Sequence, residues 1–234
     1  MSKQLQVQIW SDIACPWCYV GKRRFERALE RFEHAPDVAV TWRAFELDPS
    51  APRVRNPQPY AERIAAKYGR TPAQAQQMVD RMVEIARADG LAMDFEHAKP
   101  GNTFDAHRLL QLALERGSQA ALEERLFRGY LCEGRAIGEH DTLLSLATDV
   151  GLSAAEVSAT LATDQYAREV RADEAEARAL GIHGVPFFVL GNRYAIEGAQ
   201  PTEPMLRALE RAWSELPERI ATEDAICGPD GCAT

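Results

Sequence analysis

The chain has 234 residues, of which 46% are hydrophobic and 26% are charged. This composition is ordinary for a packed protein and excludes a chain that is disordered as a whole. Lys and Arg number 27 against 35 for Asp and Glu, so the formal net charge is −8. Phosphate groups need a basic surface, so we expect neither nucleic acid nor a membrane among the partners.

The sequence has no pattern that predicts export or insertion into a membrane. No apolar run reaches the roughly 18 residues that a membrane-spanning helix needs, and residues 1–9 lack the apolar stretch of a secretory signal. We therefore expect a cytoplasmic protein. Lasting disulfides are uncommon in that compartment, so closely spaced cysteines there usually bind a metal or carry out redox chemistry.

Residues 1–50 have the pattern of a strand, a helix and a second strand. Alternating apolar residues predict strands around Leu5–Ile9 and Val38–Ala44. Apolar residues at helical spacing predict a helix from Cys15 to about Phe32. Four prolines among residues 48–59 then indicate a linker that leaves the sheet.

Residues 60–180 have helical patterns only, and we interpret them as an all-helical insertion. Thr71 before Pro72 is typical of a helix start, and Ser153 with Glu156 has the spacing of a capping box. A helix of many charged residues ends this segment. An insertion of this size is long enough to form a subdomain of its own.

Strand patterns return in residues 181–217. A strand, a two-residue hairpin turn at Gly191 and Asn192, a returning strand and a final amphipathic helix can be assigned there. The predicted fold class is therefore α/β, with the order β-α-β, a helical insertion and β-β-α. Residues 1–50 and 181–217 form one split domain in this interpretation, and residues 218–234 form a C-terminal tail.

Two cysteine pairs are the most specific signal. Cys15 and Cys18 enclose two residues at the predicted start of the first helix, and Cys227 and Cys232 enclose four near the end of the chain. Residues three apart share one helix face, so the first two sulfurs can approach to disulfide distance. A helix start favours the reactive thiolate. We expect Cys15 to be an exposed nucleophile and Cys18 the less accessible thiol that resolves a mixed disulfide.

Zinc binding is the alternative that the cysteines leave open. Cys15 and Cys18 could supply half of a site and Cys227 and Cys232 the other half, giving a non-enzymatic binding module. Zinc-binding pairs usually lie in a hairpin turn rather than at the start of an amphipathic helix, which favours the redox interpretation. We therefore predict no metal site.

Three stretches carry motifs beyond the spacing: SDIACPWCYVG at Ser11–Gly21, NTFDAHR at Asn102–Arg108 and GIHGVPFF at Gly181–Phe188. They resemble the DsbA-like branch of the thioredoxin superfamily, and most closely the FrnE-type dithiol–disulfide oxidoreductases. The resemblance covers nearly the whole chain. It implies a thioredoxin fold with a large helical insertion, and an enzyme that reduces or isomerises protein disulfides.

The resemblance also implies roles for residues around the cysteines. Pro186 would be a cis proline facing them, and Val185 before it would offer backbone groups that can pair with an extended substrate chain. Pro16, Trp17 and His183 would border the substrate. Trp17 stands where strong periplasmic oxidants have a histidine. An indole carries no positive charge, so we expect a less oxidising pair.

The implied chemistry needs no bound cofactor. An external thiol reductant, either glutathione or a thioredoxin system, would recycle the pair, and protein disulfides or small disulfides would be the substrates. Cys227 and Cys232 resemble an auxiliary redox pair of some FrnE-like proteins. The same branch contains kappa-class glutathione transferases and 2-hydroxychromene-2-carboxylate isomerases, which typically have serine at the position of Cys15, so the two cysteines favour the oxidoreductase.

Polar residues near these motifs have less specific interpretations. Asp12 could relay a proton near Cys18, although such a residue more often satisfies a turn. Asn102, Asp105 and His107 are expected to cap or flank a helix start.

Overall fold

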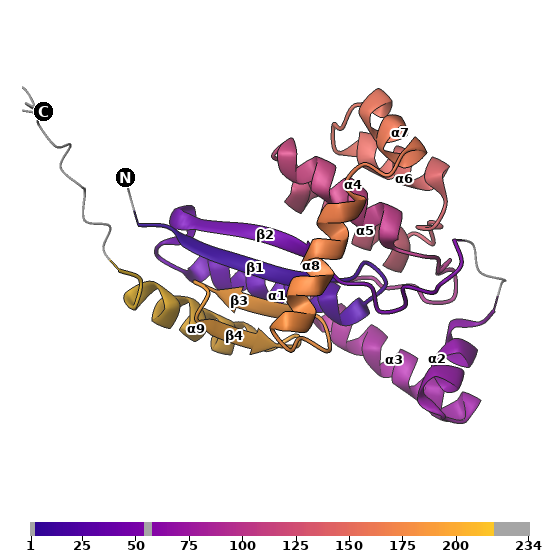
Figure 1. Cartoon of the computed structure of the whole chain (residues 1–234). Helices are drawn as coiled ribbons and strands as arrows, with labels where there is room; N and C mark the ends of the chain where they lie inside the picture. The colour runs from indigo at the N-terminus through magenta and orange to yellow at the C-terminus, as the bar shows by residue number, and fades with distance from the viewer. Residues whose placement is uncertain (1–2, 54–57, 218–234) are drawn as a thin grey trace, which may run out of the picture.

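Figure 1 shows the computed structural model, which describes residues 3–53 and 58–217. A four-stranded sheet has helices on both faces, and further helices extend beyond one end of it. The elements in chain order are β1 (Leu5–Ser11), α1 (Pro16–Arg31), the short 3-10 helix η1 (Ala35–Asp37), β2 (Val38–Ala44), α2 (Tyr60–Tyr68), α3 (Pro72–Ala88), α4 (Phe104–Glu115), α5 (Gln119–Leu131), α6 (His140–Asp149), α7 (Ala154–Ala162), α8 (Ala167–Ala179), β3 (Phe187–Leu190), β4 (Tyr194–Glu197) and α9 (Thr202–Ser214).

The sheet has the strand order β2-β1-β3-β4. Strand β1 pairs with β2 in parallel, with Val7 opposite Val40, and with β3 antiparallel, with Val7 opposite Leu190. Strands β3 and β4 form an antiparallel hairpin. The predicted β-α-β and β-β-α halves are therefore confirmed, and β1 lies in the middle of the sheet, where it leads directly into the Cys15–Cys18 segment.

Each face of the sheet is covered by helices. On one face, alternate residues of β1 such as Val7 and Ile9 pack with Phe25 of α1 and Met205 of α9. On the other face, Trp10 packs with residues of α8 and its indole Nε1 donates a hydrogen bond to the Asp173 carbonyl at 3.0 Å. Figure 1 shows α8 crossing the strands, with α1 and α9 on the opposite side.

Helix α8 is held on the sheet by the buried carboxylate of Asp173. This carboxylate accepts hydrogen bonds from Arg43 at 2.7 Å, from the Ala44 backbone at 3.0 Å and from Gln111 of α4 at 2.8 Å. Burial raises the pKa of Asp173, although Ala44 and Arg43 oppose the change. Helix α8 lies within the range that the sequence assigns to the insertion, and the Asp173 carboxylate joins it to β2 and α4.

The turn and cap predictions have mixed outcomes. Thr71 caps α3 in a reciprocal capping box with Gln74. The capping box predicted at Ser153 is wrong: this side chain makes no capping hydrogen bond, and it is exposed, so water can satisfy the first turn of α7. The hairpin loop after β3 has three residues, because Leu190 pairs with Tyr194.

None of the helices within residues 3–53 and 58–217 is long and apolar enough to cross a membrane.

Candidate active site

The two cysteines of the motif lie at the start of α1. Cys15 is the N-cap residue, with φ −98° and ψ 109°, and Pro16 occupies the first turn, where its missing N–H costs nothing. The Cys18 N–H donates to the Cys15 carbonyl at 3.1 Å. Both thiols are free, and their side chains are hydrogen-bonded to each other. The structure therefore brings the two sulfurs together as the spacing predicts.

The Val185–Pro186 peptide bond is cis and faces this helix start. The Cys15 Sγ lies 3.6 Å from the Val185 carbonyl oxygen. Gly21 of α1 lies directly against the proline, because a Cβ at that position would be only 2.8 Å from Pro186 Cγ. A glycine is therefore required for α1 to pack this closely on the loop, a constraint that the sequence analysis did not assign to Gly21.

The expected exposure of Cys15 is wrong. Its side chain is 4% exposed and that of Cys18 is fully buried. Cys15 belongs to the apolar cluster of the helical part, with Ile13 and Tyr19 in the same cluster and Val185 packed against it, so the cis-proline loop covers the sulfur. Cys15 therefore does not lie on an open surface.

The other residues predicted to border a substrate differ in their exposure. Trp17 is 42% exposed on the first turn of α1, which leaves a large apolar side chain at the surface beside the buried cysteines. Pro16 and Val185 are half-buried, and Pro186 is buried. His183 is exposed on the loop that joins α8 to the cis proline.

Cys18 is surrounded by groups that affect its proton. Burial raises the pKa of Cys18 well above its ordinary value, and the hydrogen bond to Cys15 raises it further. The Asp12 backbone and the Ser11 side chain act in the opposite direction and lower the Cys18 pKa. Cys18 is therefore a thiol at rest.

A cluster of buried polar side chains lies behind Cys18. The Ser11 hydroxyl donates to Glu123 Oε1 of α5 at 2.9 Å. The Asp12 carboxylate accepts from the Leu47 N–H at 2.7 Å and the Ala14 N–H at 3.2 Å, so it satisfies a turn. His107 Nε2 of α4 lies 3.6 Å from Asp12 Oδ1. The cluster joins the strand before the cysteines to two helices of the predicted insertion.

Electrostatic effects in this cluster are large because its side chains are buried. Burial raises the pKa of Glu123 to about 7, against the charges of His107 and Lys22. Burial works against protonation of His107, but the neighbouring Asp12 carboxylate raises the His107 pKa overall. Sequence reasoning expected His107 to flank a helix start and did not identify Glu123. Both belong to the surroundings of the cysteines.

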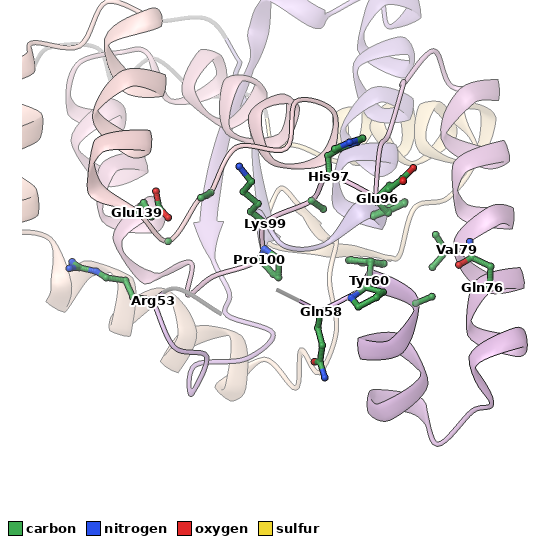
Figure 2. A pocket seen from close by; sticks show the side chains of 16 residues that line it. Arg53, Gln58, Tyr60, Gln76, Val79, Glu96, His97, Lys99, Pro100 and Glu139 are labelled. Atoms are coloured by element: carbon green, nitrogen blue, oxygen red, sulfur yellow. The ribbon is translucent and has the colours of Figure 1, made fainter. Parts of the chain in front are cut away.

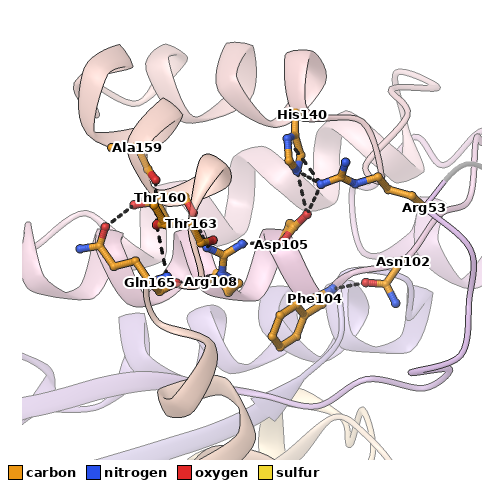
Figure 3. A network of polar contacts seen from close by, with 10 residues as sticks. All are labelled: Arg53, Asn102, Phe104, Asp105, Arg108, His140, Ala159, Thr160, Thr163 and Gln165. Atoms are coloured by element: carbon orange, nitrogen blue, oxygen red, sulfur yellow. Dashed lines mark hydrogen bonds and ion pairs between the residues drawn. The ribbon is translucent and has the colours of Figure 1, made fainter.

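Figure 3 shows how α4, the helix that carries His107, is fixed. Asp105 pairs with Arg53 at 2.9 Å, with His140 at 2.8 Å and with Arg108 at 2.7 Å. Arg108 also donates to backbone carbonyls in and after α7, including that of Gln165 at 2.8 Å. These contacts tie α4 to α6 and α7, which supports a structural role for Asp105.

Asn102 flanks the start of α4, whose N-cap residue Thr103 makes no capping hydrogen bond with its side chain. Asn102 Oδ1 accepts a hydrogen bond from the Phe104 N–H at 2.9 Å. Its amide group donates to Glu46 at 3.3 Å. Asn102 therefore stabilises the first turn of α4 and has no contact with the cysteines among those that the structure records.

A cavity of about 970 Å³ is lined by residues of α2, α3 and the segment before α4. Figure 2 shows Tyr60 of α2 and Val79 of α3 on one side of it, opposite the segment of His97 and Lys99. The Tyr60 ring stacks on the Phe95 ring, with 4.5 Å between the ring centroids. Tyr60 also packs against the apolar cluster that contains Cys15. Burial raises the pKa of Tyr60, and the nearby Tyr130 and Cys15 side chains add to the change.

The auxiliary pair predicted at Cys227 and Cys232 lies outside the described residues. Within the part of the chain that is described, no group of three or more His, Cys, Asp or Glu side chains is arranged to hold a metal ion. The zinc alternative needs all four cysteines, so it stays a prediction.

Fold and site together define a thioredoxin-fold protein with a helical insertion, a Cys-x-x-Cys helix start and a facing cis proline. The family model for the DSBA-like thioredoxin domain matches residues 6–210, and the chain belongs to this family. The predicted fold and family are thus confirmed.

Individual proteins agree with this assignment. The chain is 48% identical to a structure described as a "probable DsbA oxidoreductase SCO1869" from Streptomyces coelicolor, with a TM-score of 0.88 and 99% of each chain covered. It is 28% identical to the "Uncharacterized protein YwbO" of Bacillus subtilis, over 88% of this chain and 96% of that one. The "cytosolic disulfide reductase DsbM" of Pseudomonas aeruginosa, solved with GSH, shares the fold at 18% identity and a TM-score of 0.57, over 89% and 96% of the two chains.

Proposed function

We propose that this protein is a thiol–disulfide oxidoreductase of the FrnE type that reduces or isomerises disulfides through Cys15 and Cys18. One observation carries the proposal: two free thiols, hydrogen-bonded to each other over the first turn of α1, lie against a cis proline. Membership of the DSBA-like family is consistent with this chemistry.

Exchange would proceed in two steps. The Cys15 thiolate attacks one sulfur of the substrate disulfide, a mixed disulfide forms, and the other substrate sulfur leaves as a thiolate. The Cys18 sulfur, after losing its proton, attacks the Cys15 sulfur of that mixed disulfide. The second substrate thiolate leaves, and a Cys15–Cys18 disulfide remains. Two electrons pass to the substrate in total.

The substrate would be held beside Cys15 by the cis-proline loop and the first turn of α1. The Val185 backbone faces Cys15 and can pair with an extended chain, as in strand addition. Pro16, Trp17 and His183 would border that chain, and the exposed indole of Trp17 would contact its apolar side chains. Pro186 fixes the loop in the required position.

An external thiol would return the pair to the reduced state. We favour glutathione, because a fold relative described as a cytosolic disulfide reductase was solved with it; a thioredoxin system is the other reductant of this class. No bound cofactor or metal is needed. We place this activity in the cytoplasm, on protein or small disulfides, with Cys227 and Cys232 as an auxiliary pair that exchanges with the first.

A trapping experiment tests the proposal. In the Cys18→Ser variant the mixed disulfide on Cys15 cannot be resolved, so covalent adducts should accumulate in a cell lysate, and mass spectrometry identifies them. The double variant with Cys15→Ser and Cys18→Ser is the matched control. Equal adducts from both variants would contradict the role of Cys15.

Activity assays separate this proposal from its alternatives. Reduction of insulin disulfides with dithiothreitol should require Cys15, and Cys15→Ser should lose it while remaining folded. Unchanged turnover rules out Cys15 as the nucleophile. Isomerisation of 2-hydroxychromene-2-carboxylate in the presence of glutathione, without insulin reduction, would instead indicate the isomerase.

A further inference from the structure

Helix α2 and the turn after it carry positive side chains that no acidic side chain neutralises. Among the residues that the structure describes, Arg63, Lys67 and Arg70 have no ion pair. Glu62 is the only acidic residue in residues 58–79, although the chain as a whole has a net charge of −8. An acidic protein therefore has a locally basic surface here, formed by Arg63, Lys67 and Arg70, which we call the basic face of α2.

The guanidinium group of Arg63 lacks a hydrogen-bond acceptor. Its Cζ lies 5.4 Å from the centroid of the Tyr60 ring, one turn earlier on α2. Its Nη1 is buried and has no hydrogen-bond partner within residues 3–53 and 58–217. Arg24 of α1, which is also half-buried, pairs with Asp89 at 2.8 Å instead. A buried donor of a charged group costs free energy until an acceptor reaches it, so Arg63 has room for an anionic group from another molecule.

The other two cations have an additional role in the helix. Gly69, with φ 61°, ends α2, and Lys67 and Arg70 lie on either side of it. Cations stabilise the C-terminal end of a helix dipole, which explains a positive charge at these two positions. This explanation does not apply to Arg63, which lies in the first half of α2. The buried unpaired nitrogen therefore points to a ligand rather than to helix stability.

Helix α2 lies near the cysteines. Tyr60 and Ile64 pack against the apolar cluster that contains Cys15. Burial raises the pKa of Tyr60, Arg63 opposes the rise and Cys15 adds to it, so Tyr60 is within electrostatic reach of both. Figure 1 shows α2 and α3 extending beyond the end of the sheet at which β1 leads into α1. A substrate bound at Cys15 can therefore extend toward α2.

We propose that the basic face of α2 is a docking surface for an acidic segment of the substrate protein, next to the disulfide that Cys15 attacks. Arg63 Nη1 would donate a charge-assisted hydrogen bond to an Asp or Glu carboxylate of the substrate. Lys67 and Arg70 would attract further carboxylates. The acidic remainder of the chain repels a long polyanion such as nucleic acid, which favours a short acidic segment. This inference rests on the proposed function and specifies its substrate class.

Peptide substrates that differ only in charge test the docking surface. Each peptide has the same loop closed by one disulfide, followed by about four Glu, Gln or Lys residues. The full chain is reduced and used in excess over the peptide, so that the maximal rate and the half-saturating protein concentration are measured in a single turnover. The Glu peptide should reach half-saturation at about 10-fold lower concentration than the Gln peptide, with the same maximal rate. Added salt should reduce this advantage.

Variants of the basic face should remove the preference for the acidic peptide. Arg63→Gln should raise the half-saturating concentration for the Glu peptide about 10-fold and leave the Gln peptide unchanged, whereas Arg63→Lys keeps the charge and should retain most of the preference. Lys67→Gln combined with Arg70→Gln should cost about 3-fold. Arg168→Gln combined with Arg207→Gln is the matched control for that double variant. These two arginines are exposed on α8 and α9 and have no ion pair in the described part of the chain, so all rates should stay unchanged.

The outcomes separate this inference from the proposed function. If the wild type reduces none of the peptides, the oxidoreductase itself is contradicted. If it reduces all three with equal half-saturation, or if the control variant has the same effect as the variants of α2, the docking surface alone is overturned. Inhibition by a DNA oligonucleotide but not by polyglutamate would also overturn it. Circular dichroism establishes that each variant is folded, and the exposed pair Lys67 and Arg70 keeps the test decisive if Arg63→Gln fails to fold.

Discussion

Glu123 and Glu124 are neighbours on α5 and lie in opposite surroundings. The Glu123 carboxylate is buried against Ser11 and has one oxygen without a partner, and burial raises its pKa to about 7. The Glu124 carboxylate accepts from Tyr19, Lys22 and Arg23 at 2.5–2.8 Å. Burial opposes ionisation of Glu124 too, but Lys22 and its other partners lower its pKa overall.

The difference shows that hydrogen-bond and ion-pair partners decide whether each of these carboxyl groups loses its proton readily. Consecutive helix residues point about 100° apart, so one side chain faces the buried cluster behind Cys18 and the other faces a network of cations. A charge with several partners is retained on folding, whereas a buried carboxyl with few partners keeps its proton more strongly. The inner group can therefore exchange a proton near neutral pH, and the outer group holds helices together.

Lys22→Met should have the largest effect, because Lys22 contributes to both surroundings. Its side chain is 4% exposed and pairs with Glu26 and Glu124. Losing it should lower the free energy of unfolding by about 3 kcal/mol in urea denaturation. It should also raise the Glu123 pKa, which Lys22 holds down. Arg23→Met, on the same two glutamates but 29% exposed, should cost less than about 1 kcal/mol. Equal losses of unfolding free energy in Lys22→Met and Arg23→Met would contradict this difference between a buried and a partly exposed partner.

Glu123→Gln should stabilise the protein by about 2 kcal/mol at about pH 8. The Glu123 pKa rises from 4.5 to about 7 on folding. Between those values the folded chain holds a proton that the unfolded chain has lost, so wild-type stability falls as pH rises. The variant removes this slope and should match the wild type at about pH 4. Urea denaturation at a series of pH values measures the free energy of unfolding of both proteins. If this free energy changes with pH in parallel in the variant and the wild type, the raised pKa of Glu123 is contradicted.

Gly21→Ala, on α1, tests the effect of packing alone, because the substitution changes no charge. The added Cβ would meet Pro186 Cγ at 2.8 Å, so the cis-proline loop must shift. We expect a loss of about 1–2 kcal/mol that is the same at every pH, because no titratable group changes. A pH-dependent loss would indicate that the loop position controls the buried cluster.

Glu124→Gln should have the smallest effect, with the opposite sign to Glu123→Gln. A carboxyl whose pKa is lowered on folding stabilises the protein above its unfolded pKa, and this stability is lost as pH falls through the folded value. The side chain is 32% exposed, so we expect a loss of only about 0.5 kcal/mol at neutral pH. The loss should vanish in acid. A gain of stability at neutral pH would show that the two glutamates do not differ as described.

The sequence predicts well what depends on local patterns. Alternation predicts β1 and β2, and spacing predicts that Cys15 and Cys18 share the first turn of α1. The cis form of Pro186 follows from the resemblance of the GIHGVPFF motif rather than from local physics alone. These features are encoded within a few neighbouring residues, so tertiary packing is not needed to find them.

Features that depend on contacts between distant segments are not predicted. Glu123 lies 108 residues after Cys15 in sequence and meets the site only because α5 packs beside β1 and α1. Its spacing of four from Gln119 and Phe127, both buried, is a weak signal for an inward-facing position. The burial of Cys15 likewise depends on the cis-proline loop folding over it. Charge alone suggests solvent exposure for Glu123, and packing reverses that expectation.

The most direct test of the central claim is a redox titration of the Cys15–Cys18 pair. The full chain is equilibrated with mixtures of reduced and oxidised glutathione and quenched with an alkylating reagent, and mass spectrometry then measures the peptide that contains both cysteines. We expect a reversible two-electron transition in which an internal Cys15–Cys18 disulfide replaces two alkylated thiols together. Two thiols that stay alkylated at every ratio, or that only form separate mixed disulfides with glutathione, would contradict it.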